Sequence, residues 1–185
     1  MKQRLPGLWQ LIALVLALAM VTAVPAQQSD SGYELGSGDV ISIQVFGEPD
    51  LSFSDIRLTG AGTVPFPFLG EVQALGRTRA ELERTIEAQL RDGYLVNPEV
   101  TVNVIRYRDY YVTGEVRAPG AYPFEPGTTV RKAISRAGGF TDRASRSNIV
   151  IYDDERSQEA DEGRDAEMET QINPGDILTV NESFF

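Results

Sequence analysis

The chain has 185 residues, a formal net charge of −10 and neither cysteine nor histidine. The lack of these two residue types excludes disulfide bonds, a lipid-bearing thiol, Ser-His-acid and Cys-His nucleophiles, and the ordinary histidine zinc sites. The acidic balance also argues against nucleic acid as a partner, because phosphate binding depends on clustered Lys and Arg.

The first 26 residues have the layout of a secretory signal peptide. Lys2 and Arg4 precede an apolar run over 8–24, and small residues stand before a cleavage site at Ala26. Cleavage there removes two cations and no acids, which takes the net charge from −10 to −12. The alternative is an anchor that stays in the membrane, since the run is nearly long enough to span it. We expect cleavage, and therefore an exported protein without a lipid anchor.

The next hundred residues predict strands around one helix. Residues 40–46 alternate apolar and polar side chains and predict a strand. Shorter extended segments are expected near 56–58 and 64–72, where Pro65 and Pro67 favour an edge or a bend. Thr78 and Glu81 form a capping-box pattern at the start of a helix over 79–92, whose apolar stripe would cover one side of a sheet. Residues 99–107 predict the clearest strand of the chain.

The remaining residues repeat this layout. We expect a strand over 109–116, a short extended piece at 122–124, a second helix capped by Thr128 or Thr129, and closing strands at 149–152 and 177–180. The boundary between the two layouts falls near 106–109, and each combines one helix with a small mixed sheet. The sequence therefore predicts an α+β fold.

Residues 153–169 hold nine acids against two arginines. A run this polar buries too little apolar surface to fold alone, so we interpret it as a solvated hairpin loop. A calcium loop is the functional alternative, but the segment lacks the spacing of a known calcium cage.

A Gly-Asp pair stands directly before a strand at two places. Gly36-Ser37-Gly38-Asp39 precedes the first strand and Asn173-Pro174-Gly175-Asp176 precedes the last. Glycine adopts positive φ and aspartate bonds the following backbone, so we favour a structural turn over a ligand site. Nothing indicates a buried, opposed carboxylate pair, and we expect no catalytic residue, no cofactor and no metal.

Aromatic residues gather near the boundary between the two layouts. Core packing explains most of them, and aromatic rings can also anchor protein interfaces or stack on sugars. Tyr110, Tyr111 and Tyr122 are the candidate interface residues.

Several ordered motifs resemble those of the bacterial polysaccharide export family, the Wza-like proteins. Tyr33-x-Leu-Gly-x-Gly-Asp-x-Ile-x-Ile-x-Val-x-Gly-x-Pro-Asp-Leu-Ser52 resembles the start of its export domain, and the motifs at Pro67–Val72, Gly76-x-Thr78 and Pro98–Val102 continue it. Downstream, Val112-x-Gly114-x-Val116-x-x-Pro119-Gly120-x-Tyr122, Ala137-Gly138-Gly139-Phe140-Thr141 and Pro174-Gly175-Asp176-Ile177-Leu178 resemble a soluble-ligand-binding β-grasp (SLBB) module. Two features depart from the family pattern, namely Ser37 in place of the usual Pro and Gly60-Ala61-Gly62 in place of an Asp-Gly turn.

The resemblance implies an export domain over 32–107 and one SLBB domain over 108–181. Its structural motif residues would be Gly36, Gly38, Asp39, Gly114, Pro119, Gly120, Gly138, Gly139, Gly175 and Asp176. Larger members end in an amphipathic helix that builds an outer-membrane pore, whereas this sequence stops five residues after its last predicted strand. We therefore expect that the chain does not make that pore itself.

By this resemblance the protein is a periplasmic, outer-membrane-associated component of a capsule or exopolysaccharide export machine. It would form a homo-oligomeric ring that passes the polymer between an inner-membrane co-polymerase and a separate outer-membrane β-barrel. The acidic loop would then point away from an acidic polymer. The alternative is a monomeric periplasmic glycan-binding module with a regulatory role.

Overall fold

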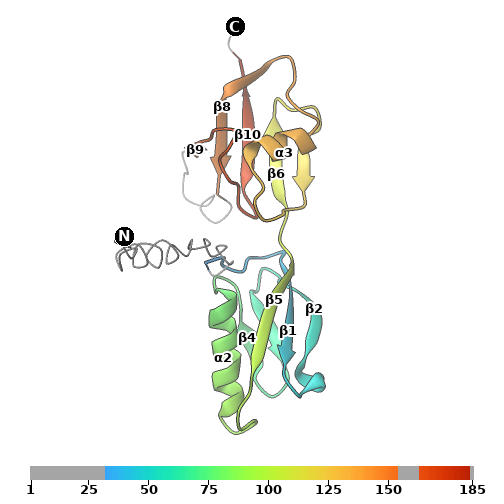
Figure 1. The fold of residues 1–185 in the computed structure, drawn as a ribbon, viewed down its shortest axis with the longest axis vertical. Helices are drawn as coiled ribbons and strands as arrows, with labels where there is room; N and C mark the ends of the chain where they lie inside the picture. The colour runs from blue at the N-terminus through green and yellow to red at the C-terminus, as the bar shows by residue number, and fades with distance from the viewer. Residues whose placement is uncertain (1–31, 154–162, 184–185) are drawn as a thin grey trace, which may run out of the picture. The chain divides into compact units, whose positions relative to one another are not determined.

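The computed structural model describes residues 32–153 and 163–183. The predicted signal peptide lies outside them, as does most of the acidic loop. The first half contains β1 (Val40–Val45), η1 (Pro49–Leu51), β2 (Phe53–Arg57), β3 (Thr63–Phe66), β4 (Gly70–Gln73), α2 (Arg79–Arg91) and β5 (Val100–Arg106). The second half contains β6 (Tyr110–Gly114), β7 (Gly120–Tyr122), α3 (Val130–Arg136), β8 (Ala144–Tyr152), β9 (Arg164–Asp165) and β10 (Ile177–Glu182). The arrangement is the α+β fold that the sequence predicts (Figure 1).

The first half forms an antiparallel sheet in the order β2-β1-β5 and a separate hairpin, β3-β4. Its N-terminal core combines Ile41, Ile43 and Val45 of β1 with Leu82, Ile86 and Leu90 of α2. The predicted capping box is present, because the Thr78 hydroxyl accepts from the Glu81 amide and the Glu81 carboxylate accepts from the Thr78 amide. The segment predicted as an edge or bend is a hairpin, with Pro65 exposed in β3 and Pro67 in the turn.

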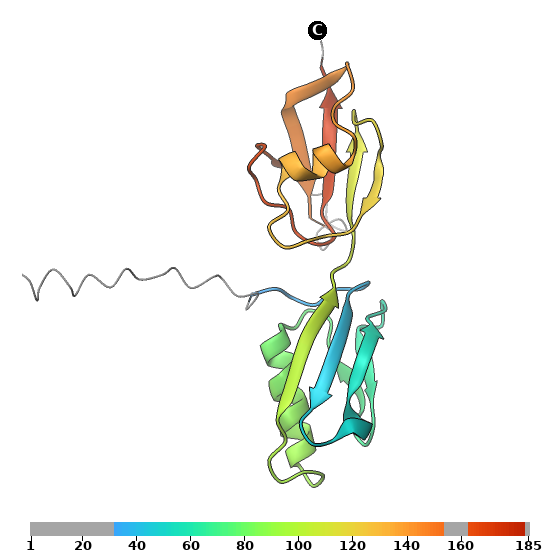
Figure 2. The ribbon, with the colours of Figure 1, turned by 45° about the vertical axis from the view of Figure 1, so that its right-hand side comes forward.

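The helix α2 lies along the edge strand β5 (Figures 1 and 2). The Glu83 carboxylate accepts from the Val102 amide at 2.8 Å, and the Glu87 carboxylate accepts from the Val100 amide at 3.1 Å. These amides point away from the partner strand β1 and would otherwise lack a partner in the sheet. The helix therefore both packs on the core and covers the edge of the sheet.

The second half is a mixed sheet in the order β7-β6-β10-β8-β9 with α3 packed on it. Strands β6 and β10 are parallel and the other pairs are antiparallel. Val130, Ala133 and Ile134 of α3 join Ile149, Ile151 and Leu178 in the C-terminal core. The strand β8 begins at Ala144, five residues earlier than predicted. Its first half is polar and lacks the apolar pattern that predicts a strand, but Ala144 pairs with Glu182 of β10.

Candidate functional site

The first Gly-Asp pair forms a closed turn. The Asp39 amide donates to the Gly36 carbonyl at 3.2 Å, and the Gly36 amide donates to the Asp39 carboxylate at 2.8 Å. Gly38, between them, has φ +99°, a conformation that favours glycine. The turn leads directly into β1.

The second pair repeats this geometry before β10. The Asp176 amide donates to the Asn173 carbonyl at 3.2 Å, the Asn173 amide donates to the Asp176 carboxylate at 2.8 Å, and Gly175 has φ +91°. Burial raises the pKa of Asp176 to about 6, against the hydrogen bond from Asn173, and Arg164 lies 3.4 Å away. The shared backbone bonds support the structural interpretation of both motifs.

Asp39 differs from Asp176 in the number of groups that it holds. Its carboxylate, which is fully buried, also accepts from the Tyr33 hydroxyl at 2.6 Å and from the Arg108 amide at 2.7 Å. The Arg108 guanidinium donates to the Tyr33 hydroxyl at 3.0 Å and lies 3.7 Å from the carboxylate. Burial and the bond to Asp39 raise the pKa of Tyr33. One carboxylate thus joins the start of the N-terminal core to the chain that leaves β5.

The other motif glycines shape the second half. Gly114, at the end of β6, has φ +79°, and a Cβ there would lie 2.1 Å from the Val180 carbonyl oxygen of β10. Gly138 and Gly139 end α3 with φ +79° and +87°. Pro119 precedes β7, which begins at Gly120. Gly114, Gly138 and Gly139 therefore serve a close backbone approach or the end of a helix, whereas a Cβ at Gly120 would meet nothing within 4 Å.

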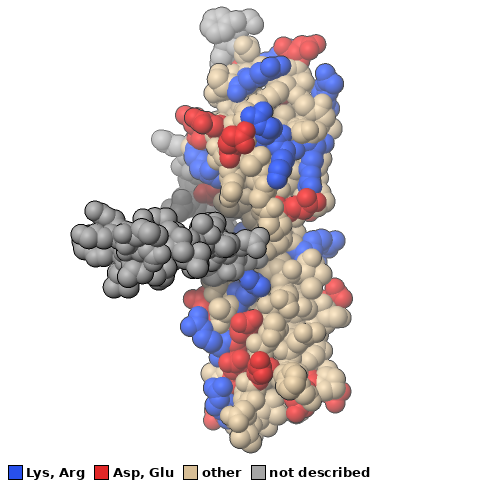
Figure 3. Space-filling model, viewed as in Figure 1, with Lys and Arg blue, Asp and Glu red and all other residues tan. Residues whose placement is uncertain are grey.

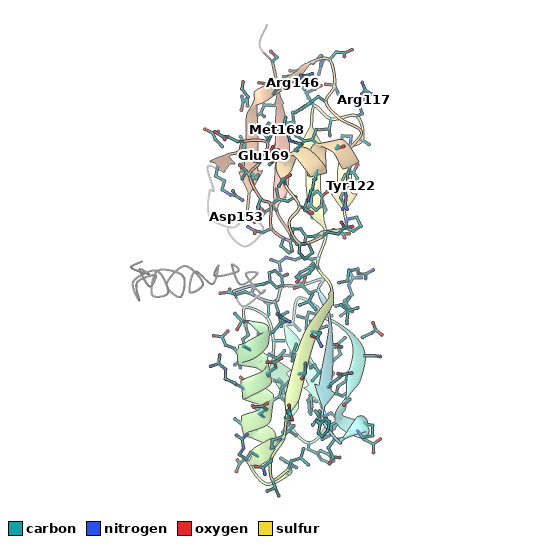
Figure 4. The ribbon with its side chains drawn as sticks, in the orientation of Figure 1. Arg117, Tyr122, Arg146, Asp153, Met168 and Glu169 are labelled. Atoms are coloured by element: carbon teal, nitrogen blue, oxygen red, sulfur yellow. The ribbon has the colours of Figure 1, made fainter. Side chains whose placement is uncertain are left out.

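The three predicted interface tyrosines occupy different environments. Tyr110 is fully buried and its ring stacks on that of Tyr122 at 5.9 Å between centroids, so it is not available to a partner. Tyr122 is half-buried on β7 (Figure 4) and donates to the Ala118 carbonyl. Tyr111 is 46% exposed and remains the accessible member of the set.

Part of the predicted acidic loop is visible at its two ends. Asp153 follows β8, and β9 pairs with β8 as a short hairpin (Figure 4). Met168 packs against the C-terminal core, and Glu169 accepts from Arg131 at 2.7 Å. Residues 154–162 lie outside the described residues.

Charged side chains of the second half pair with one another near α3. Figure 3 shows Lys and Arg gathered over this helix. Arg131 pairs with Glu169 at 2.7 Å and Arg136 with Glu125 at 2.6 Å, and their hydrogen bonds lower the pKa of Glu125 and raise that of Arg136. These pairs are largely exposed, so each contributes little to stability.

The sequence reasoning missed four exposed apolar side chains in turns and loops of the first half, here called the loop-end patch: Phe46, Phe68, Tyr94 and Val96. Phe46 and Val96 are 82% and 86% exposed, and the Phe46 amide donates to Glu99 in the loop that carries Val96. The carboxyl end of β1 and the loop after α2 lie at the same end of the N-terminal sheet (Figure 2).

The aromatic pair of the loop-end patch is held in place. The rings of Phe68 and Tyr94 stack at 5.5 Å, and the Tyr94 hydroxyl donates to the Phe68 carbonyl at 3.2 Å. Phe68 has φ +66°, an unfavourable conformation for a bulky residue. Strain of this kind persists where the surrounding structure imposes it and is common at functional sites. An aromatic residue within a turn, Phe68, and another directly after the helix-ending Gly93, Tyr94, were the sequence features that could have indicated this surface.

Two family models match the chain in succession. The model described as polysaccharide biosynthesis/export protein matches residues 27–105, and the SLBB domain matches residues 110–167. The first covers the N-terminal core, and the second covers the C-terminal core except Ile172 and the last strand, β10. The chain belongs to the Wza-like polysaccharide export family. The α+β fold of this chain therefore consists of an export domain followed by an SLBB domain, as the sequence motifs predict.

Curated relatives in this export family carry related names. The chain is 31% identical over 140 residues to the exopolysaccharide production protein ExoF of Rhizobium meliloti, which covers 70% of this chain and 33% of ExoF. It is 30% identical over 182 residues to the EPS I polysaccharide export outer membrane protein EpsA of Ralstonia solanacearum; this match covers 79% of this chain and 45% of EpsA. The polysialic acid transport protein KpsD of Escherichia coli is 25% identical over 122 residues, covering 64% and 22%. The chain therefore spans less than half the length of these relatives.

Within residues 32–153 and 163–183, no helix is both long and apolar enough to cross a bilayer. In the same ranges, no three acidic side chains gather in a way that would hold a metal ion.

Proposed function

We propose that this protein is a component of a machine that exports a capsular polysaccharide or exopolysaccharide, and that it acts in the periplasm next to the outer membrane. The observation that carries the proposal is the succession of the two family models, each over most of one folded half. The names of two relatives, a polysaccharide export outer membrane protein and a polysialic acid transport protein, support it. The mechanism is passive, because the protein confines the polymer and makes or breaks no bond.

The protein acts as a homo-oligomeric ring between an inner-membrane co-polymerase and an outer-membrane partner. The loop-end patch supports assembly, because large exposed apolar side chains, two of them in ring contact, are typical of protein interfaces. Phe46 and Val96 project from loops and are more than four-fifths exposed. The occupant that we propose for the patch is a second copy of this chain.

Deletion of the gene tests the export function. The expected result is loss of surface polymer while intracellular synthesis of its precursors continues, with recovery when the gene is supplied in trans. Unchanged surface polymer in the deletion strain would contradict the proposal.

Light scattering on the purified protein tests the ring. We expect a concentration-dependent mass above that of the monomer, reduced by Phe46→Ser. Ile105→Ser is the matched control, because Ile105 is 56% exposed but lies on β5, outside the loop-end patch. A protein that stays monomeric at high concentration would favour the alternative, a monomeric glycan-binding regulatory module.

A further inference from the structure

Three arginines line one cavity at the Gly-Asp turn of β1. The cavity has a volume of about 370 Å³ and is lined by Arg57, Arg106 and Arg108, with Tyr107, Asp109 and Tyr111 also on its wall. This volume lies near the lower end of the range for small-molecule sites, which begins at roughly 300 Å³. Asp109 is the one acidic residue of the lining. In a chain with 27 acids and 17 cations, the composition of this wall is unusual.

The register of the N-terminal sheet explains why the arginines meet. Val40 pairs with Arg57 on one side and with Arg106 on the other. Because neighbouring strands lie about 4.8 Å apart, the two arginine Cα atoms are separated by about 10 Å. Arginine side chains are long enough to bring two guanidinium groups to one anion across that span. Arg108 follows two residues later and is held against Asp39 and Tyr33.

In the part of the chain that the structure describes, Arg57 and Arg106 form no ion pair, although Asp109 lies on the same wall. Both are exposed, and among the residues that the structure describes neither guanidinium donates to a carboxylate or to a carbonyl. Like charges placed in one row of a sheet lower stability. The Asp39 carboxylate is already engaged by Arg108, so it offers little relief to the pair. A bound anion would relieve this repulsion.

The chemistry of the wall selects the class of anion. Guanidinium groups recognise planar carboxylates through paired hydrogen bonds. Tyr111, 46% exposed, offers an aromatic face on which a sugar ring can stack. A carboxylate and a ring in one ligand describe an acidic sugar unit better than an acidic peptide, whose carboxylates sit on flexible side chains.

We propose that Arg57 and Arg106 form a binding site for the carboxylate of an acidic sugar unit in the exported polymer, with Tyr111 against its ring. The assignment of the ligand as the exported polymer rests on the proposed function. The presence of an anion site rests on the two arginines and the cavity alone.

Titration of the purified full chain with tetragalacturonate, followed by calorimetry, tests the site. Maltotetraose is the neutral probe, and tetraglutamate is the acidic peptide probe. We expect binding of tetragalacturonate that weakens as salt is added, and no binding of maltotetraose. The variant Arg57→Gln/Arg106→Gln should bind at least about tenfold more weakly, because two charge-assisted contacts are lost. The control Arg91→Gln/Arg117→Gln removes two exposed arginines elsewhere and should bind like the parent.

Three results would overturn the site. These are no binding of tetragalacturonate at millimolar concentration, equal loss in the control variant, or tighter binding of tetraglutamate than of the sugar acid. Circular dichroism of each variant separates loss of binding from loss of folding. If deletion of the gene abolishes surface polymer while tetragalacturonate does not bind, this inference fails and the export function stands. If tetragalacturonate binds but deletion leaves the polymer unchanged, the site stands and the export function fails.

Discussion

The two Gly-Asp turns allow a matched test of what a buried carboxylate contributes. Asp39→Ala removes the acceptor of three hydrogen bonds, from the amides of Gly36 and Arg108 and from the Tyr33 hydroxyl. It also removes the carboxylate that lies 3.7 Å from the Arg108 guanidinium, whose side chain is 11% exposed. Removal of one partner of a buried ion pair costs about 3–5 kcal/mol. We expect the free energy of unfolding of the N-terminal core to fall by about that amount.

Asp176→Ala is the control, because the backbone turn is the same. This substitution removes the carboxylate that accepts a hydrogen bond from the Asn173 amide. It also removes a 3.4 Å contact with Arg164, whose side chain is 41% exposed. Loss of a single hydrogen bond costs about 1 kcal/mol. Relief of the buried charge offsets part of this cost at pH 7, because burial raises the pKa of Asp176 to about 6. The two substitutions should therefore differ by at least ~2 kcal/mol.

Urea unfolding at pH 7, followed by far-ultraviolet circular dichroism, measures both effects. The signal must come from the backbone, since the single tryptophan, Trp9, lies in the predicted signal peptide. Each variant is compared with the parent in the transition of the core that it belongs to. Equal losses for the two variants would refute the reasoning, because they would mean that the extra partners of Asp39 add nothing.

Three further substitutions, one with a control, test single features. Asp176→Asn should gain stability relative to the parent as pH rises from about 4 to 7. The pKa of Asp176 is raised in the folded protein, so the parent loses the stability of the protonated acid over that range, whereas asparagine does not titrate. Parallel pH profiles of the two proteins in urea melts would contradict this. Gly114→Ala should cost ~2 kcal/mol or more, because it adds a Cβ at positive φ against the β10 backbone, whereas Gly120→Ala, with nothing within 4 Å, should be nearly neutral in thermal melts. Thr78→Ala should cost about 1 kcal/mol through loss of the cap, and no change in the urea midpoint would count against the capping box.

The elements set by local chemistry were predictable from the sequence. The helix at 79–91 follows from a capping box that spans four residues and an apolar stripe with helical spacing, and both are confined to the helix and its N-cap residue. The Gly-Asp turns likewise close through atoms three residues apart. Such features need no knowledge of the rest of the fold.

The features that depend on distant partners were not predictable. The Arg108 amide meets Asp39 across 69 residues, and Arg57 meets Arg106 only because both strands pair with Val40. The sequence was compatible with Tyr110 at the surface, but in the folded sheet its ring is buried in the C-terminal core. One residue of register decides which face a strand side chain occupies, and a single sequence does not contain that register.

The two glutamates of α2 limit how copies of this protein can join. A sheet that continues from one molecule into the next requires free amides on an outer strand, and Glu83 and Glu87 occupy two of those on β5. Polymerisation through that strand would have to expel both carboxylates. Edge-to-edge pairing of strands from two molecules is thus disfavoured at β5. Association on this side of the domain would have to use side-chain contacts.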